Sequence, residues 1–375
     1  MKQKLLVTLS AIILVLSGCS AGIGGENMTG DKKESDGDKK TVTNHQLSNE
    51  YYRTLVPYKV STARGVTVEN LNSSYNVKEF ETGLLGISQK VFPTDQFIFE
   101  EGQHLDREMV TEWLGRKSEE NPNGLNPEDN GNVEPTGRNP MYLAQVLEQD
   151  YMVQNGDDIS LGGITIGLAM NSIDYYRKVA YGDIFKTEIS SEDTLAKGKE
   201  MADQVISRLR EMEGLSQIPI TIAIYEQSSQ DSLSPGNYLA YAVSQNGATN
   251  VTDWKNVNEK NMVMPSDEAK EEHNDDLTSF ANFQTAIQDY FPNLNGVVGN
   301  AKYVDNVLSK LTITVNIQFY GEAEIISFTQ HVADSVGKFL PNSAAIEVRM
   351  ISVNGMESFV SRDAGGETMV NHVFN

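Results

Sequence analysis

The sequence predicts an α+β protein with mixed sheets, in which two tandem helix-β-α-β-β units follow a helical N-terminal segment. Two apolar runs alternate with small or polar residues, as buried strands do, and each run precedes an amphipathic helix and a return strand. The same order of elements occurs twice, which indicates an internal repeat. A strand joined to the next through a helix normally forms a right-handed parallel crossover, and a hairpin adds an antiparallel neighbour. Each sheet should therefore be mixed.

The N-terminal segment, residues 51–140, is expected to hold two short helices. The first helix is predicted by Asn76 as N-cap with a glutamate three residues later. The second should start at Asp106 and end at Gly115. A loop rich in Pro, Asn, Gly and Glu, residues 119–139, separates these helices from the first unit.

The two units are predicted over residues 141–265 and 276–375. The first should contain a helix Tyr142–Asp150, a strand Ile164–Met170, a helix Ser190–Gly214, a return strand from Ile220 and a strand Tyr238–Val243. The second should contain a helix Phe280–Phe291, a strand Leu311–Phe319, a helix Ile325–Phe339, a return strand Ile346–Met350 and a hairpin turn at Asn354-Gly355. The acidic run Glu268 to Asp276 is interpreted as a solvated linker between the units.

The N-terminus has the features of a lipoprotein signal peptide, residues 1–18. Lys2 and Lys4 precede an apolar stretch that is too short to span a bilayer. Leu16-Ser17-Gly18-Cys19 then fits the lipobox pattern of aliphatic, small, small, cysteine. We expect Cys19 to receive lipid from lipoprotein diacylglyceryl transferase before signal peptidase II removes the leader. The alternative is an ordinary secretory signal with an incidental cysteine.

Composition limits the partners of the mature chain. Cys19 is the single cysteine, so no thiol remains for a disulfide, a metal site or a nucleophile once lipid is attached. The leader removes Lys2 and Lys4 and no acid, so the net charge falls from −22 to −24, which argues against nucleic acid as a partner. Residues 19–50 are polar and charged and predict a disordered tether. Attachment to the membrane should therefore depend on the acyl chains.

The body carries no short catalytic or cofactor motif. A nucleophile elbow, a phosphate loop and a zinc-protease pair are all absent from the sequence, and the histidines are far apart. The loop Asn126 to Glu134 has oxygen ligands but fails the spacing of a calcium site, so we interpret it as a solvated acidic loop. We expect no metal, no cofactor and no catalytic residue.

Polar side chains gather just past the ends of predicted strands, where crossover sheets often bind ligands. These candidates for a binding groove are Asn171, Tyr175, Tyr176, Gln227, Ser228 and Tyr320. Amide and hydroxyl groups beside aromatic rings would suit a sugar or a peptide. The alternative is turn capping, because Asn and Ser also hydrogen-bond their own backbone in such places.

A series of short segments runs along nearly the whole chain: Tyr52-Arg53-Thr54-Leu55, Val91-Phe92-Pro93-Thr94-Asp95, Gly124-Leu125-Asn126-Pro127, Leu147-Glu148-Gln149-Asp150 and Thr165-Ile166-Gly167-Leu168-Ala169-Met170-Asn171-Ser172. In this order they resemble the CamS family, lipoproteins of low-GC Gram-positive bacteria named for a sex pheromone made from their signal peptide. The resemblance also implies a tandem-repeat body.

The resemblance implies that the leader releases a short apolar peptide. Here it would be Ala11-Ile12-Ile13-Leu14-Val15-Leu16-Ser17, which lacks the aromatic residue that the family's peptide has after Ala-Ile. A plasmid-encoded receptor in other cells would recognise such a peptide and start conjugation. The body is then expected to be a non-enzymatic binding or interaction module. A receptor for solutes or cell-wall fragments is the alternative, followed by a cell-envelope hydrolase using paired carboxylates.

Overall fold

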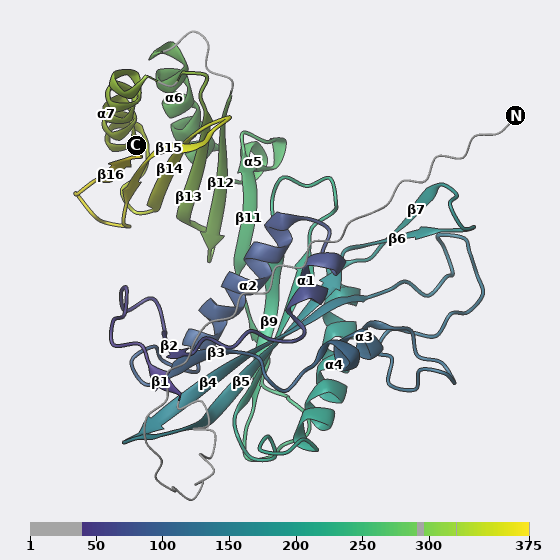
Figure 1. The fold of residues 1–375 in the computed structure, drawn as a ribbon. Coiled ribbons are helices and arrows are strands. Elements are labelled where there is room, and N and C mark those ends of the chain that lie inside the picture. Colours follow the sequence, from purple (N-terminus) through teal and green to yellow (C-terminus); the bar gives the residue numbers. More distant parts are fainter. Residues whose placement is uncertain (1–39, 291–295, 320, 375) are drawn as a thin grey trace, which may run out of the picture. The chain divides into compact units, whose positions relative to one another are not determined.

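The structure, a computed structural model, describes residues 40–290, 296–319 and 321–374 (Figure 1). The predicted leader, Cys19 and most of the predicted tether lie outside the described residues. Helices and mixed sheets make up the described chain, which confirms the α+β class. None of the helices within these ranges is long and apolar enough to cross a bilayer.

The first sheet has eight strands, in the spatial order β1-β2-β3-β4-β5-β8-β9-β10. Their bounds are β1 Thr41–Val42, β2 Arg53–Val56, β3 Ile98–Glu101, β4 Leu143–Asn155, β5 Asp158–Asn171, β8 Ile220–Gln227, β9 Asn237–Ser244 and β10 Lys255–Asn256. β5 and β8 are parallel, while β8 and β9 are antiparallel. The predicted crossover and its hairpin partner are thus confirmed in this unit.

Helices α2 (Ser74–Gln89) and α4 (Ser191–Arg210) pack on opposite faces of this sheet. Ile164 and the apolar residues that alternate with it on β5 pack in one cluster with α4. The residues between them are small, and a Cβ on Gly167 would lie 2.9 Å from the ring of Phe80 on α2. Small side chains on this face therefore let α2 approach closely, which explains why β5 is buried on both faces.

The predicted start signals of two helices are confirmed, and a third differs. Ser190 caps α4 and Asp106 caps α3 (Arg107–Leu114) through side-chain bonds to backbone N–H groups. α2 begins before the predicted position, because Ser73 is its cap. Asn76 lies buried in the first turn instead, and its Oδ1 accepts bonds from the hydroxyl of Tyr225 and from backbone N–H groups.

The predicted helix Tyr142–Asp150 is wrong, because this segment forms β4. The strand pairs with β5 along nearly its whole length and with β3 on its other side. Apolar residues at positions 143, 146 and 147 match helical spacing by coincidence, and the non-local pairing decides the structure. The N-terminal segment is likewise not only helical. It holds α1 (Arg64–Asn70), α2 and α3, but β2 and β3 join the sheet.

The second sheet has six strands in sequential order: β11 Glu259–Met264, β12 Gly296–Val304, β13 Val307–Asn316, β14 Ala345–Ser352, β15 Gly355–Arg362 and β16 Val370–Val373. β13 and β14 are parallel, and the hairpin into β15 is antiparallel, as predicted. Its turn is formed by Val353 and Asn354 rather than by the predicted pair Asn354-Gly355, because Gly355 already pairs with Ser352. Helices α6 (Asn274–Tyr290) and α7 (Glu322–Phe339) lie side by side against this sheet (Figure 1). Burial alternates along β12 and β14, as in a sheet covered on one face.

The predicted linker Glu268 to Asp276 is wrong in its structure. Most of its side chains are exposed as expected, but the segment forms α5 (Asp267–Glu272) and the start of α6. A separate two-stranded ribbon, β6 (Ile173–Arg177) with β7 (Ile184–Glu188), precedes α4. The boundaries of the two predicted units stay predictions.

Candidate functional site

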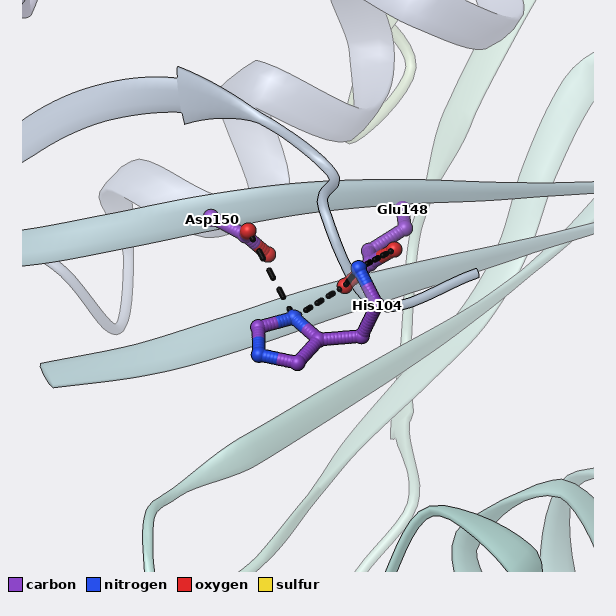
Figure 2. A group of neighbouring side chains, drawn as sticks. All are labelled: His104, Glu148 and Asp150. Atoms are coloured by element: carbon purple, nitrogen blue, oxygen red, sulfur yellow. Dashed lines mark hydrogen bonds and ion pairs between the residues drawn. The ribbon is translucent and has the colours of Figure 1, made fainter. Parts of the chain in front are cut away.

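The side chains of a histidine and of two acids on β4 meet in one cluster (Figure 2). The cluster lies on the face of β4 opposite α2, because the alternating residues Leu147 and Gln149 contact α2. Glu148 and Asp150 are two residues apart on the strand, so they point to the same face. His104 comes from the loop between β3 and α3, and its Nδ1 lies 2.8 Å from Oε1 of Glu148 and 3.6 Å from Oδ2 of Asp150. The carboxylate side chains are almost wholly buried, at 2% and 1% exposure.

The loop backbone folds around the same carboxylates. The N–H groups of His104 and Leu105 donate to Glu148, and the N–H of Gln103 donates to Asp150. Gly102 makes this approach possible, because a Cβ there would lie 2.4 Å from the Cβ of Glu148. The loop is therefore fixed to the strand by hydrogen bonds to charged acceptors, which are stronger than bonds between neutral groups.

The electrostatics of this cluster favour a proton on the imidazole. Hydrogen bonds with Asp150 and then Glu148 raise the pKa of His104 to about 10. Burial raises the pKa of Asp150, and the neighbouring Glu148 adds to this effect. The imidazolium carries one positive charge and so balances one of the two buried carboxylates, while the raised pKa of Asp150 favours the neutral form of the other. The cluster in this state supports the loop.

The same three residues could also hold a metal ion. One ligand atom from each lies within 4.8 Å of the others, which makes them a possible metal-binding group within the described chain. The contacts among the three side chains are explained without a metal ion. Glu148 already accepts bonds from His104 and Leu105, and a proton on Nδ1 accounts for the contacts to both carboxylates. Oδ1 of Asp150 is buried without a hydrogen-bond partner among the described residues.

A pocket of about 220 Å³ opens where β3 ends beside β4, and residues on the α2 side of both strands contribute to it. Its lining comes from the loop before α1, from the first residue of α1, from α2 and from the two strands: Tyr58, Ser61, Arg64, Glu81, Leu85, Phe99, Glu101, Leu147, Glu148 and Gln149. This volume is below the roughly 300 Å³ at which drug-sized ligand pockets begin. The pocket therefore suits a small molecule or one end of a longer one.

The two acidic groups contributed by β3 and α2 have different surroundings. Glu101 accepts hydrogen bonds from the Tyr58 hydroxyl at 2.7 Å and from the Ser61 N–H at 2.8 Å, and Nη1 of Arg64 lies 3.4 Å away. The Glu81 carboxylate has no hydrogen bond or salt bridge to any described residue. Burial raises the pKa of Glu81, the charge of Arg64 opposes this shift, and Glu101 adds to it.

The structure brings some of the predicted groove residues together. Asn171 and Gln227 are paired on β5 and β8, and Gln227 Nε2 donates to Asn171 Oδ1 at 2.6 Å. Ser228 donates through its N–H and its hydroxyl to Asn76 Oδ1. Tyr175 accepts a hydrogen bond from the N–H of residue 230. The observed contacts fit turn capping well, and the predicted groove stays a prediction.

Tyr176 and Tyr320 do not add to that group. The Tyr176 hydroxyl donates to the carbonyl of Val133, and the guanidinium of Arg138 lies 3.8 Å from its ring centre. Tyr320 lies outside the described residues. In the predicted acidic loop, Asn126 is fully buried and bonds the backbone of Leu143, whereas residues 128–134 are exposed.

Sequence reasoning missed His104, Glu148 and Asp150. The signal was present as two acids two residues apart, but it has meaning only on a strand. On a helix, residues with that spacing point in different directions. The wrong assignment of this segment as a helix therefore hid the cluster.

The comparisons with known proteins agree with one another. The profile of the family described as CamS sex pheromone cAM373 precursor matches residues 58–368. The crystal structure of a sex pheromone precursor from Lactobacillus salivarius is 40% identical, covers 90% of this chain and 99% of its own, and superposes with a TM-score of 0.85. The C-terminal domain of the staph-cAM373 sex pheromone precursor from Staphylococcus aureus is 33% identical over 82% of this chain and 98% of its own, with a TM-score of 0.71.

No curated protein shows significant similarity to the chain. The family profile nevertheless spans most of the sequence, and the lactobacillar structure matches in both sequence and fold. The chain belongs to the CamS sex pheromone cAM373 precursor family.

Proposed function

We propose that this protein is an extracellular lipoprotein whose lipid at Cys19 holds it on the outer face of the cell membrane. The observation that carries this proposal is the lipobox Leu16-Ser17-Gly18-Cys19 at the N-terminus of a chain from a pheromone precursor family. Each methylene of a buried acyl chain contributes roughly 0.8 kcal/mol, and two chains anchor a protein stably. The strongly acidic body is repelled by anionic lipid, so the acyl chains supply the attachment.

The leader is the source of a signalling peptide. Cleavage before Cys19 and trimming would release the apolar segment Ala11–Ser17, which carries no charged side chain. Such a peptide is small enough to leave through a cell wall and apolar enough to enter a receptor groove. The neighbours described as sex pheromone precursors support this role. Recognition by a plasmid-encoded receptor in other cells would complete the pathway.

Mass spectrometry of the culture medium and the membrane fraction tests both products of the leader. The medium should contain a peptide ending at Ser17 or Gly18, and the membrane fraction should contain a mature chain starting with acylated Cys19. A mature N-terminus that carries no lipid, in cells with an active lipid transferase, would overturn the anchoring proposal.

The body is proposed to act as a non-enzymatic binding or interaction module. A receptor for solutes or cell-wall fragments is the more narrowly defined form of this role. The pocket beside Glu81 supports this role because it joins an unpaired carboxylate to apolar walls. A thermal-shift screen of sugars, peptides and cell-wall fragments tests it, since a ligand that binds only the folded state raises the melting temperature. A screen in which none of these classes raises the melting temperature would count against a binding role.

The hydrolase alternative has weaker support from the carboxylates on β4. Glycosidases place their two carboxyl groups roughly 5 to 9.5 Å apart, with the sugar or a water between them. Here the imidazole of His104 lies between Glu148 and Asp150, and both acids accept hydrogen bonds from the loop backbone. This arrangement leaves no room for a substrate between the two acids.

A further inference from the structure

We infer that the pocket beside Glu81 binds a primary ammonium group carried by a small apolar ligand. The inference rests on the proposed binding role of the body and names the class of ligand that the body would take. It is carried by three features of the described residues: a carboxylate without a partner, a cation that is already committed elsewhere, and apolar walls.

Glu81 is the acceptor that the ligand would engage. It is half-buried on α2, and its side chain lines the pocket without a hydrogen bond or salt bridge to a described residue. Burying a carboxylate without a partner costs free energy, and the rise in the pKa of Glu81 reflects that cost. An ammonium group would offset this cost, because the ligand brings both a positive charge and hydrogen-bond donors to the carboxylate.

Arg64 neutralises Glu81 only in part, because its charge lowers the pKa of Glu81 while its salt bridge is made to Glu101. Its Nη1 lies 3.4 Å from Glu101, and its side chain is 61% exposed, whereas that of Glu101 is only 16% exposed. Glu101 also accepts bonds from Tyr58 and Ser61. The acceptors of Glu101 are therefore occupied, and Glu81 is left as the group that faces an incoming cation.

The rest of the wall decides what kind of cation fits. Leu85, Leu147 and Phe99 contribute half-buried apolar surface to the pocket. Calcium and magnesium ions need six or more oxygen ligands. The oxygens of Glu101 and Glu148 in this lining already accept hydrogen bonds, so Glu81 is the carboxylate that stays open to a cation. An organic ammonium needs fewer acceptors and gains from aliphatic contact and from aromatic rings near its charge. Apolar walls beside one open carboxylate therefore favour an amine over a metal ion.

Calorimetric titration of the full mature chain with three matched probes tests the inference. Leucinamide carries the ammonium, N-acetyl-leucinamide lacks the charge, and 4-methylpentanoate carries a negative charge on a similar apolar group. We expect leucinamide to bind and the other two to bind at least about tenfold more weakly, since a hydrogen bond between charged groups is worth about that factor.

Three variants fix the site. Glu81→Gln should weaken leucinamide binding about tenfold or more, whereas Arg64→Gln should strengthen it by removing a competing positive charge. Glu108→Gln removes the same charge at an exposed position on α3 and should change nothing. Loss of a partnerless carboxylate should not impair folding, which a melting curve of the Glu81→Gln chain checks.

The outcomes separate this inference from the wider proposal. Equal binding of leucinamide and N-acetyl-leucinamide would overturn the ammonium class and leave the binding role standing. Equal binding by the parent chain and Glu81→Gln would overturn the site. If none of the three probes binds, the inference fails and this pocket no longer supports a binding role, while lipid anchoring and peptide release are unaffected.

Discussion

Replacing His104 with alanine should destabilise the protein by about 2–4 kcal/mol. The substitution removes the Nδ1–H bond to Glu148 at 2.8 Å and the longer contact of 3.6 Å to Asp150. A hydrogen bond between charged groups contributes roughly 1.5–3 kcal/mol, and breaking a buried ion pair by deleting one partner costs roughly 3–5 kcal/mol. The expected loss lies below the upper end of the ion-pair range, because Glu148 keeps its backbone N–H donors when the imidazole is removed.

Urea unfolding followed by tryptophan fluorescence measures this effect, since Trp113 on α3 is 3% exposed and should report the loss of the fold around the cluster. His45→Ala is the control, because His45 is exposed. The raised pKa of His104 also predicts the direction in which this effect changes with pH. The stabilisation that charged His104 gives the folded state should be complete below pH about 6.5 and should fade as pH rises to about 10. The unfolding free energies of the parent chain and of His104→Ala should therefore converge at high pH. An effect no larger than that of His45→Ala, or one that grows with pH, would refute the reasoning.

Other substitutions test the packing and the pocket. Asn76→Ala leaves the donors that meet Asn76 Oδ1 unsatisfied and should cost at least about 2 kcal/mol in urea unfolding. Gly167→Ala forces its Cβ against Phe80 and should cost about 1–3 kcal/mol, whereas Gly86→Ala on α2 has open space and should stabilise by up to about 1 kcal/mol. Leucinamide affinity should fall on acidification as Glu81 takes up a proton, because the pKa of Glu81 is raised.

Local patterns predicted the repeated core of both sheets. The alternating run on β5 and the stripe on α4 report burial directly, because each residue's environment follows from its place in the period. The parallel pairing of β5 with β8 and of β13 with β14 then follows from the handedness of crossovers.

The sequence did not predict the structure of β4 or the cluster on it. β4 is held by pairing with β3, some fifty positions earlier in the chain, and with β5. Such non-local pairing leaves no reliable period in a single segment. The pocket depends on the same long-range contacts, since Glu81, Glu101 and Arg64 come from separate elements. Composition alone could not have joined them.

The central claim is that lipid on Cys19 holds the body at the cell surface and is required before the leader peptide can be cleaved and released. Comparing cells that express Cys19→Ala with cells that express the unaltered chain tests it most directly. We predict that the variant keeps its leader uncleaved, that it carries no lipid, and that the peptide Ala11–Ser17 disappears from the medium. A variant that is cleaved after Gly18 and stays on the cell surface as firmly as the parent would contradict the account.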